Sequence, residues 1–136
     1  MKFKTIQGSL KRVPKIRNYS INWDEPSKSK IQFKTKQFIK DYWGNHVVFE
    51  EFPVAGTRLS LDFYNATKKI AIEVQGAQHR KYVPYFHGGH KSNYIDQLRR
   101  DKQKLEFCQI NGIKLMEVYD GDELKKSLFK KYGINL

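Results

Sequence analysis

The sequence has a single cysteine, Cys108, among 136 residues, so it cannot form a disulfide within the chain. It has no apolar run long enough to span a membrane, and no apolar segment of the kind found in secretory leaders. A chain of this length can bury a core as one domain without disulfides. We therefore expect a soluble, cytoplasmic protein.

Acidic residues are scarce, because 26 Lys and Arg outnumber 14 Asp and Glu for a formal net charge of +12. Residues 1–40 alone have eleven Lys and Arg against two acids. Cations interleaved with aromatic residues are typical of nucleic-acid contacts, although a solvated basic tail has the same composition. The segment has no amphipathic helical stripe, which disfavours membrane binding. We expect a basic N-terminal arm over residues 1–28 and one domain over 29–136.

Hydrophobic periodicity and chain-breaking residues predict an alternation of helices and strands. The expected elements are a helix from Ser27 or Ser29 to about Trp43, strands near 46–52, 58–64 and 69–75, a helix from Asn93 to Gly112, a strand over 113–119 and a helix over 123–132 capped by Asp120 or Asp122. The stripes expected to face the core are Ile31, Phe38, Ile39 and Tyr42, then Ile95, Leu98, Leu105 and Cys108.

The order of these elements predicts the topology of the sheet. Three strands joined by short turns form a meander, whereas the helical link to the fourth strand makes the last two strands parallel. The predicted fold is therefore α/β (α+β), with a mixed four-stranded sheet flanked by helices.

Two neighbouring strands of this sheet carry acidic residues at positions where polar and apolar residues alternate. A turn centred near residue 67 places Asp62 opposite Ala71 or Glu73, and in either register Asp62 and Glu73 are neighbours. With the carbonyl of Val74, they offer three oxygen atoms to a hard cation of the Mg²⁺ kind. Such a cation polarises a phosphoryl oxygen and activates water, which is what phosphodiester hydrolysis requires.

Polar residues follow this pair along the chain. Gln75 lies on the same face as Glu73 and can orient water or phosphate, although it is neither a cation nor a base. His79 comes four residues later and can serve as a general base or donate a hydrogen bond to phosphate. His87 and His90 are expected to contact phosphate or a DNA groove. A zinc site built from these histidines and Cys108 is an alternative, but it matches no familiar ligand spacing.

The pattern D-F-Y, a short turn, I-E-V-Q-G-x-x-H and then R-R-D-x-x-K-L-x-F-C-x-x-N-G-I-K-L resembles the PD-(D/E)xK nuclease superfamily. More narrowly, it is similar to very-short-patch-repair-like endonucleases and to phage-borne homing endonucleases of the EDxHD type. The resemblance covers roughly residues 29–118. It implies a restriction-endonuclease-like fold and Mg²⁺-dependent hydrolysis of double-stranded DNA, with Mn²⁺ as a substitute, in the cytoplasm of the host bacterial cell if a phage encodes the protein.

The resemblance also implies roles for single residues. Asp62 matches the metal-binding aspartate of the family, and Glu73 matches the acid of the (D/E)xK element. Gln75 stands where many members have lysine. His79 matches the histidine after the third strand, and Asp101 matches the aspartate on the following helix.

The chain departs from the family pattern in two places. Many members have a glutamate on the first helix, where the nearest candidates here are Gln32 and Gln37. Glu50 or Glu51 on the first strand is the alternative for this fifth position. Mismatch-repair members also have a cysteine-rich structural zinc site, which one cysteine cannot build, so a simpler relative is expected.

Cationic residues and loop histidines are expected to contact DNA. These residues are Lys11, Arg12, Lys15, Arg17, Arg58, Arg80, Lys81, His87, His90, Arg99 and Arg100. Because one metal centre cleaves one strand at a time, double-strand breaks would require a homodimer. Two other hypotheses stay open: a non-catalytic nucleic-acid-binding module on a degenerate nuclease fold, and a structure-specific resolvase of branched DNA.

Overall fold

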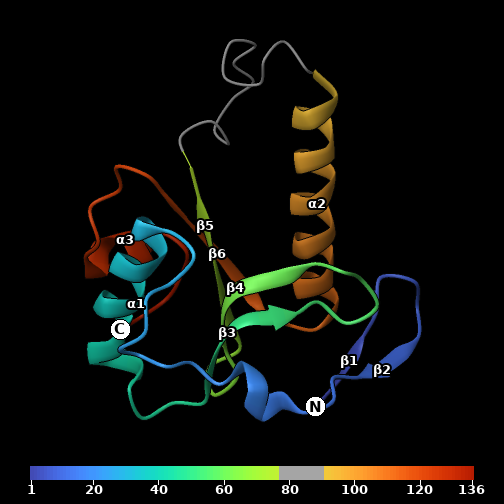
Figure 1. Ribbon diagram of the computed structural model, residues 1–136, viewed down its shortest axis with the longest axis horizontal. Coiled ribbons are helices and arrows are strands. Elements are labelled where there is room, and N and C mark those ends of the chain that lie inside the picture. Colours follow the sequence, from blue (N-terminus) through green and yellow to red (C-terminus); the bar gives the residue numbers. More distant parts are fainter. Residues whose placement is uncertain (77–90) are drawn as a thin grey trace.

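The computed structural model describes residues 1–76 and 91–136 (Figure 1). Its strands are β1 (Lys2–Lys4), β2 (Leu10–Arg12), β3 (Val48–Pro53), β4 (Ser60–Asn65), β5 (Ile70–Gln75) and β6 (Lys114–Tyr119). Its helices are α1 (Lys30–Trp43), α2 (Lys91–Ile110) and α3 (Lys126–Lys130), with a 3₁₀ turn at Ile16–Tyr19.

The main sheet has the strand order β3-β4-β5-β6. The pairs β3–β4 and β4–β5 are antiparallel, whereas β5 and β6 are parallel and are joined through α2. Figure 1 shows α1 and α3 on one side of this sheet, with α2 and the β1–β2 hairpin on the other. The expected α+β class and the mixed four-stranded sheet flanked by helices are confirmed.

Each face of the sheet has its own apolar layer. On the side of α1 and α3, the fully or almost fully buried residues Ile39 and Trp43 pack with Ile72, Met116 and Phe129. The opposite layer contains aromatic residues of β3 and β4 together with the last turns of α2. Two separate apolar layers fix the sheet between its helices.

The basic N-terminal segment packs against the second layer. Its strands β1 and β2 form a short antiparallel hairpin, and the buried ring of Phe3 lies 5.7 Å from the ring of Phe52 and 5.5 Å from that of Phe107. The side chain of Asn111 at the end of α2 also bonds the backbone of Lys4, at 2.8 and 2.9 Å. Within the predicted basic N-terminal arm, the structure thus has two strands anchored to the core.

Helix α1 begins where the capping pattern predicts. Ser29 is the N-cap residue, and its side chain accepts a hydrogen bond from the Gln32 amide at 3.2 Å. The buried side of α1 is more polar than expected, since Gln32 and Lys36 are buried along with Ile39. The ammonium group of Lys36 pairs with Glu50 at 2.9 Å, so this charge has a partner inside the fold.

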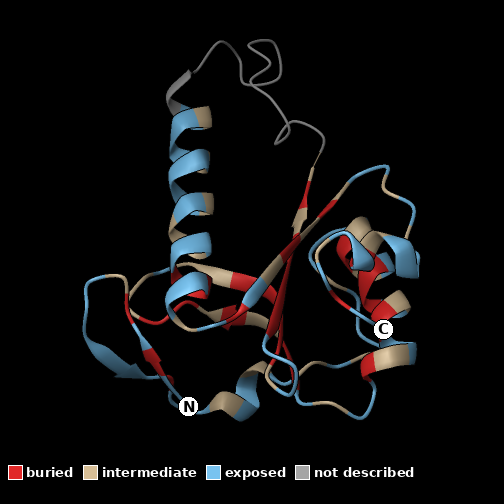
Figure 2. Ribbon diagram, turned by 180° about the vertical axis from the view of Figure 1, so that it is seen from behind, coloured by how far each residue is buried: buried red, intermediate tan, exposed pale blue. Residues whose placement is uncertain are grey.

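The apolar stripe predicted for α2 is wrong in three of its four positions. Cys108 is fully buried, but Ile95, Leu98 and Leu105 are 46%, 46% and 44% exposed. The helix begins at Lys91, two residues before the expected cap Asn93. Figure 2 shows α2 exposed along most of its length, because its upper turns stand away from the strands. The residues of α2 that line a pocket with β4 and β5 are polar: Gln97, Arg100, Asp101 and Lys104.

The last helix is shorter than predicted and has a different cap. It spans Lys126–Lys130 with Lys125 as the N-cap residue, instead of 123–132 after Asp120 or Asp122. The carboxylate of Asp122 accepts a hydrogen bond from the Tyr119 amide at 2.7 Å, so it closes the turn after β6. Within the described part of the chain, no helix has the length and apolar character needed to cross a lipid bilayer.

Candidate active site between the β4–β5 hairpin and helix α2

The strands β4 and β5 separate at the two predicted acidic residues. Their backbone register pairs Phe63 with Ile72, and its continuation places Asp62 opposite Glu73, one of the two expected registers. At this point, hydrogen bonds between backbone amides and carboxylate side chains replace the backbone hydrogen bonds that join the strands. The Asp62 amide donates to Glu73 Oε2 at 2.7 Å, and the Val74 amide donates to Asp62 Oδ2 at 2.8 Å. These bonds hold both carboxylates at the opening of the hairpin.

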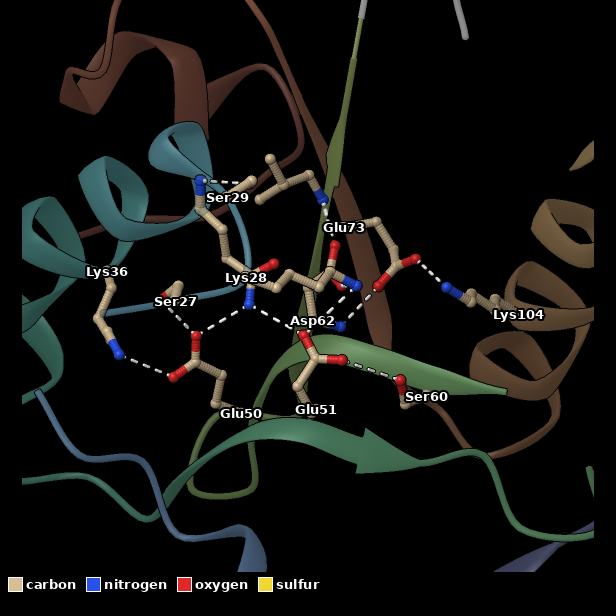
Figure 3. A network of polar contacts seen from close by, with 12 residues as sticks. Ser27, Lys28, Ser29, Lys36, Glu50, Glu51, Ser60, Asp62, Glu73 and Lys104 are labelled. Carbon is tan, nitrogen blue, oxygen red and sulfur yellow. Dashed lines mark hydrogen bonds and ion pairs between the residues drawn. The ribbon is translucent and has the colours of Figure 1, made fainter. Parts of the chain in front are cut away.

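Each of the two carboxylates has an ammonium partner (Figure 3). Lys28, just before α1, places its Nζ 2.9 Å from Asp62 Oδ1 and 3.4 Å from Glu51 Oε1. Lys104 of α2 places its Nζ 2.5 Å from Glu73 Oε1. The two lysines differ in exposure, since the side chain of Lys28 is 60% exposed and that of Lys104 is 16% exposed.

Burial makes the Glu73 carboxylate difficult to ionise. Loss of solvation and the nearby charge of Asp62 raise its pKa to about 7, although Lys104 and the Asp62 amide act in the opposite direction. A site in which two buried carboxylates repel each other favours additional positive charge. At neutral pH Glu73 is therefore close to its own pKa, and Lys104 stabilises its ionised form.

We expect the stability of the metal-free protein to fall as the pH rises from about 4.5 to about 7. In this range the folded state keeps a proton on Glu73 that the unfolded state has released, because the folded pKa is the higher one. For the wild type, this proton should make the free energy of unfolding lower at pH 8 than at pH 5 by on the order of 3 kcal/mol. Glu73→Gln should remove this dependence on pH. Urea denaturation at pH 5 and pH 8 measures it.

Glu106→Gln on the exposed side of α2 is the matched control, and it should retain the pH dependence of the wild type. If Glu73→Gln also retained it, Glu73 would not be the group that titrates.

A pocket of about 440 Å³ opens beside the two carboxylates. Its lining includes six residues that the sequence predicted for the site: Asp62, Glu73, Val74, Gln75, Arg100 and Asp101. It also includes Lys28 and Lys104, which were not predicted as residues of the metal site. The structure therefore brings the predicted metal ligands together with the acid on α2 and three cationic side chains.

Gln75 is held by the neighbouring strand. Its buried side chain donates from Nε2 to Glu117 Oε2 at 3.2 Å, and the hydroxyl of Tyr119 donates to the same oxygen at 3.1 Å. Glu117 lies beside Glu73 in the parallel β5–β6 register. Gln75 is thus fixed in orientation next to Glu73, and Glu117 is a supporting residue that no sequence pattern indicated.

The residues considered for a fifth site position form a hydrogen-bonded group in the structure. Glu51 has φ 54 in the middle of β3, in the left-handed region that residues other than glycine rarely adopt. As a result, Glu50 and Glu51 both reach Gln32 Nε2, at 2.8 and 3.0 Å. Glu50 is already paired with Lys36, whereas Glu51 shares Lys28 with Asp62. Gln37 instead donates to the Trp23 carbonyl at 2.7 Å.

The donor set of this site suits a hard divalent ion bound largely through water and substrate. Among the residues that the structure describes, no group of three or more His, Cys, Asp or Glu side chains is placed to hold a metal. Mg²⁺, however, is commonly held by one or two carboxylates with water and phosphate completing its shell. Asp62 and Glu73, both more than nine-tenths buried and hydrogen-bonded in place, match that pattern.

The remaining predicted residues fall outside the pocket. Lys11, Arg12, Lys15, Arg17 and Arg58 are exposed but do not line it, and Arg99 forms an exposed pair with Asp96 at 3.5 Å. The predictions for His79, Arg80, Lys81, His87 and His90 lie outside the described residues. Burial raises the pKa of the Cys108 thiol to about 12, which disfavours the thiolate that a zinc ligand needs.

Of the two lysines that were missed, one had a signal in the sequence. Lys104 follows Asp101 by three residues, so both lie on the same side of α2. The apolar stripe predicted for α2 would place that side toward solvent. Lys28 reaches Asp62 across 34 positions of the chain, a contact that no local pattern predicts.

Comparison with known proteins finds relatives in viruses. Uncharacterized protein 094L of Frog virus 3 (isolate Goorha) is 47% identical over 66 residues, 48% of this chain and 43% of the relative. Uncharacterized protein 307L of Invertebrate iridescent virus 6 is 35% identical over 74 residues, 54% of this chain and 37% of the relative. The matched regions thus span less than half of these curated relatives. No protein-family model and no solved structure matches the chain significantly.

Proposed function

We propose that this chain is a metal-dependent endonuclease that hydrolyses phosphodiester bonds of double-stranded DNA on a restriction-endonuclease-like fold. The observation that carries the proposal is the pair Asp62 and Glu73, buried side by side at a strand opening and facing a pocket with cationic walls. Buried acids are costly unless paired or bound to a cation. Metal-assisted phosphate chemistry uses this combination of carboxylates and nearby positive charge.

Asp62, Glu73 and the Val74 carbonyl would hold the divalent ion. When bound, Mg²⁺ or Mn²⁺ supplies a Lewis acid for the phosphoryl oxygen and lowers the pKa of an attacking water. The Asp62 and Val74 amides keep the two carboxylates in place through the bonds at 2.7 and 2.8 Å.

Cations and amides of the pocket would act on the substrate. Lys104 carries positive charge beside Glu73 and takes the place of the lysine that the family has at Gln75. Gln75, oriented by Glu117, would position water or a phosphate oxygen. Arg100 and Asp101 line the same pocket from α2, where Arg100 would bind phosphate and Asp101 would orient water.

The exposed cations outside the pocket would bind the DNA backbone. Lys11 and Arg12 on β2, with Lys15 and Arg17 after it, form a basic surface on a hairpin that the core holds in place. Arg58 lies in the turn between β3 and β4. Phosphate contacts from such residues position DNA without selecting a sequence. Cleavage of both strands would require two copies of the chain.

The proposal is tested by incubating the wild-type chain with supercoiled plasmid in Mg²⁺, in Mn²⁺ and in EDTA. We expect nicked or linear product in either metal and none in EDTA, because the two carboxylates need a divalent ion to activate water. Agarose gel analysis of the plasmid forms measures the product.

If neither metal supported cleavage while the chain still bound duplex DNA, the enzyme hypothesis would be abandoned. A non-catalytic DNA-binding module would then be the better description. Cleavage of branched junctions in preference to plasmid would instead favour the resolvase hypothesis.

A further inference from the structure

Lys28 occupies the place at which the site would need a cation. Its ammonium group lies between Asp62 Oδ1 and Glu51 Oε1, at 2.9 and 3.4 Å, and thus bridges carboxylates from two adjacent strands. The Asp62 carboxylate is 4% exposed, so it has little access to water with which to replace this partner. Lys28 therefore neutralises Asp62, a carboxylate that the proposed function assigns to a metal.

The position of Lys28 in the fold makes this contact easy to exchange. Its side chain is 60% exposed, in contrast to Lys104, which is 16% exposed and enclosed by α2 and β5. Lys28 directly precedes the N-cap Ser29, at the positive end of α1, where the helix dipole repels a cation. Attraction to the two carboxylates is therefore what keeps the ammonium group in the site.

The charges at the site favour competition between Lys28 and a divalent ion for Asp62. Asp62, Glu73 and Glu51 carry three negative charges when ionised, and Lys28 and Lys104 carry two positive ones. A divalent ion added to this cluster must share Asp62 with a like charge. Like charges within a few ångströms of each other repel, so an exposed ammonium group moves away more cheaply than a buried one.

We infer that Lys28 is an exchangeable internal cation, which neutralises Asp62 and Glu51 in the metal-free protein and moves to a phosphate of the DNA when a divalent ion binds Asp62. The inference rests on the proposed function. It assigns Lys28 to substrate binding, because the binding of the metal would release this lysine to bind DNA. Lys28 and Asp62 line the same pocket, so a phosphate bound there would be within reach of the lysine.

The first test measures Mn²⁺ binding by isothermal titration calorimetry without DNA, for the wild type and Lys28→Met. Lys28→Met should bind Mn²⁺ roughly three- to tenfold more tightly, the range expected for release of one partly exposed competing charge. The control is Lys40→Met, since Lys40 pairs with Asp24 at 3.1 Å, is 43% exposed and is absent from the pocket lining. The control should bind Mn²⁺ as the wild type does.

The second test measures duplex DNA binding by fluorescence anisotropy in Ca²⁺ and in EDTA. Lys28→Met should weaken binding several-fold in Ca²⁺, where the wild-type ammonium group is released, and leave it nearly unchanged in EDTA. An equal loss in both conditions would overturn the inference, because it would make Lys28 an ordinary phosphate contact.

The outcomes separate this inference from the proposed function. If the wild type binds Mn²⁺ and cleaves DNA, but Lys28→Met binds Mn²⁺ no more tightly, only the exchange is refuted. If neither protein binds Mn²⁺, the metal site itself is wrong and both proposals fail. Thermal unfolding should show that Lys28→Met is folded, with a midpoint below that of the wild type, because the buried carboxylate of Asp62 loses an ammonium partner.

Discussion

Asp62→Asn should lower the rate of plasmid cleavage in Mg²⁺ by roughly a thousandfold or more, the loss expected when metal-based charge stabilisation of several kcal/mol is removed. The amide keeps the size of the side chain, and its oxygen can still accept the hydrogen bond from the Val74 amide. It lacks the negative charge that would hold the ion. Initial rates of nicking measure the effect.

The matched control for this change is Asp24→Asn, which removes a carboxylate that is 85% exposed and pairs with Lys40; neither residue lines the pocket. It should cleave at the wild-type rate. Circular dichroism should show both variants folded. If Asp62→Asn kept full activity, the chain would still be a nuclease, but its metal centre would not be the one described above.

Lys104→Met should reduce cleavage by about 10- to 100-fold, the range typical of groups that hydrogen-bond a metal-binding carboxylate. It should also move the acidic limb of the pH–rate profile to higher pH. Lys104 lowers the pKa of Glu73, so its removal leaves Glu73 protonated over a wider range. The acid must lose that proton to bind a cation, and initial rates between pH 6 and 9.5 measure the shift.

Lys102→Met removes the same charge from the same helix, but Lys102 is exposed and two positions away. It should keep the wild-type pH profile. Lys104→Arg should restore most of the lost rate, because it returns a positive charge to Glu73. A rate loss in Lys104→Met without any change in the profile would mean that Lys104 acts only through packing or DNA affinity.

Local patterns in the sequence predicted the sheet and the carboxylate pair well. Alternation along the hairpin and the short turn near residue 67 limited Asp62 to two registers, and the structure has the one that faces Glu73. The capping residue Ser29 and the helical crossover to β6 were confirmed for similar reasons, since caps and connections depend on neighbouring residues.

Contacts between distant segments were not predictable in this way. The stripe Ile95, Leu98 and Leu105 has helical spacing, but all three side chains are more than 40% exposed, so spacing alone misassigned the inward side of α2. Glu51 breaks the alternation of β3 through its left-handed φ, which no composition rule indicates. Lys28 and Lys36 are paired across the fold with acids of other elements.

The docking of the N-terminal hairpin has a consequence for folding kinetics. The bonds between Lys4 and Asn111 close a loop across 107 positions of the chain, and contacts of such separation carry a high entropic cost of closure. The ring of Phe3 contacts the rings of Phe52 and Phe107, so its packing requires that α2 and the sheet have come together. We therefore expect this part of the basic surface to dock late in folding, and deleting it would uncover core aromatics as well as remove charge.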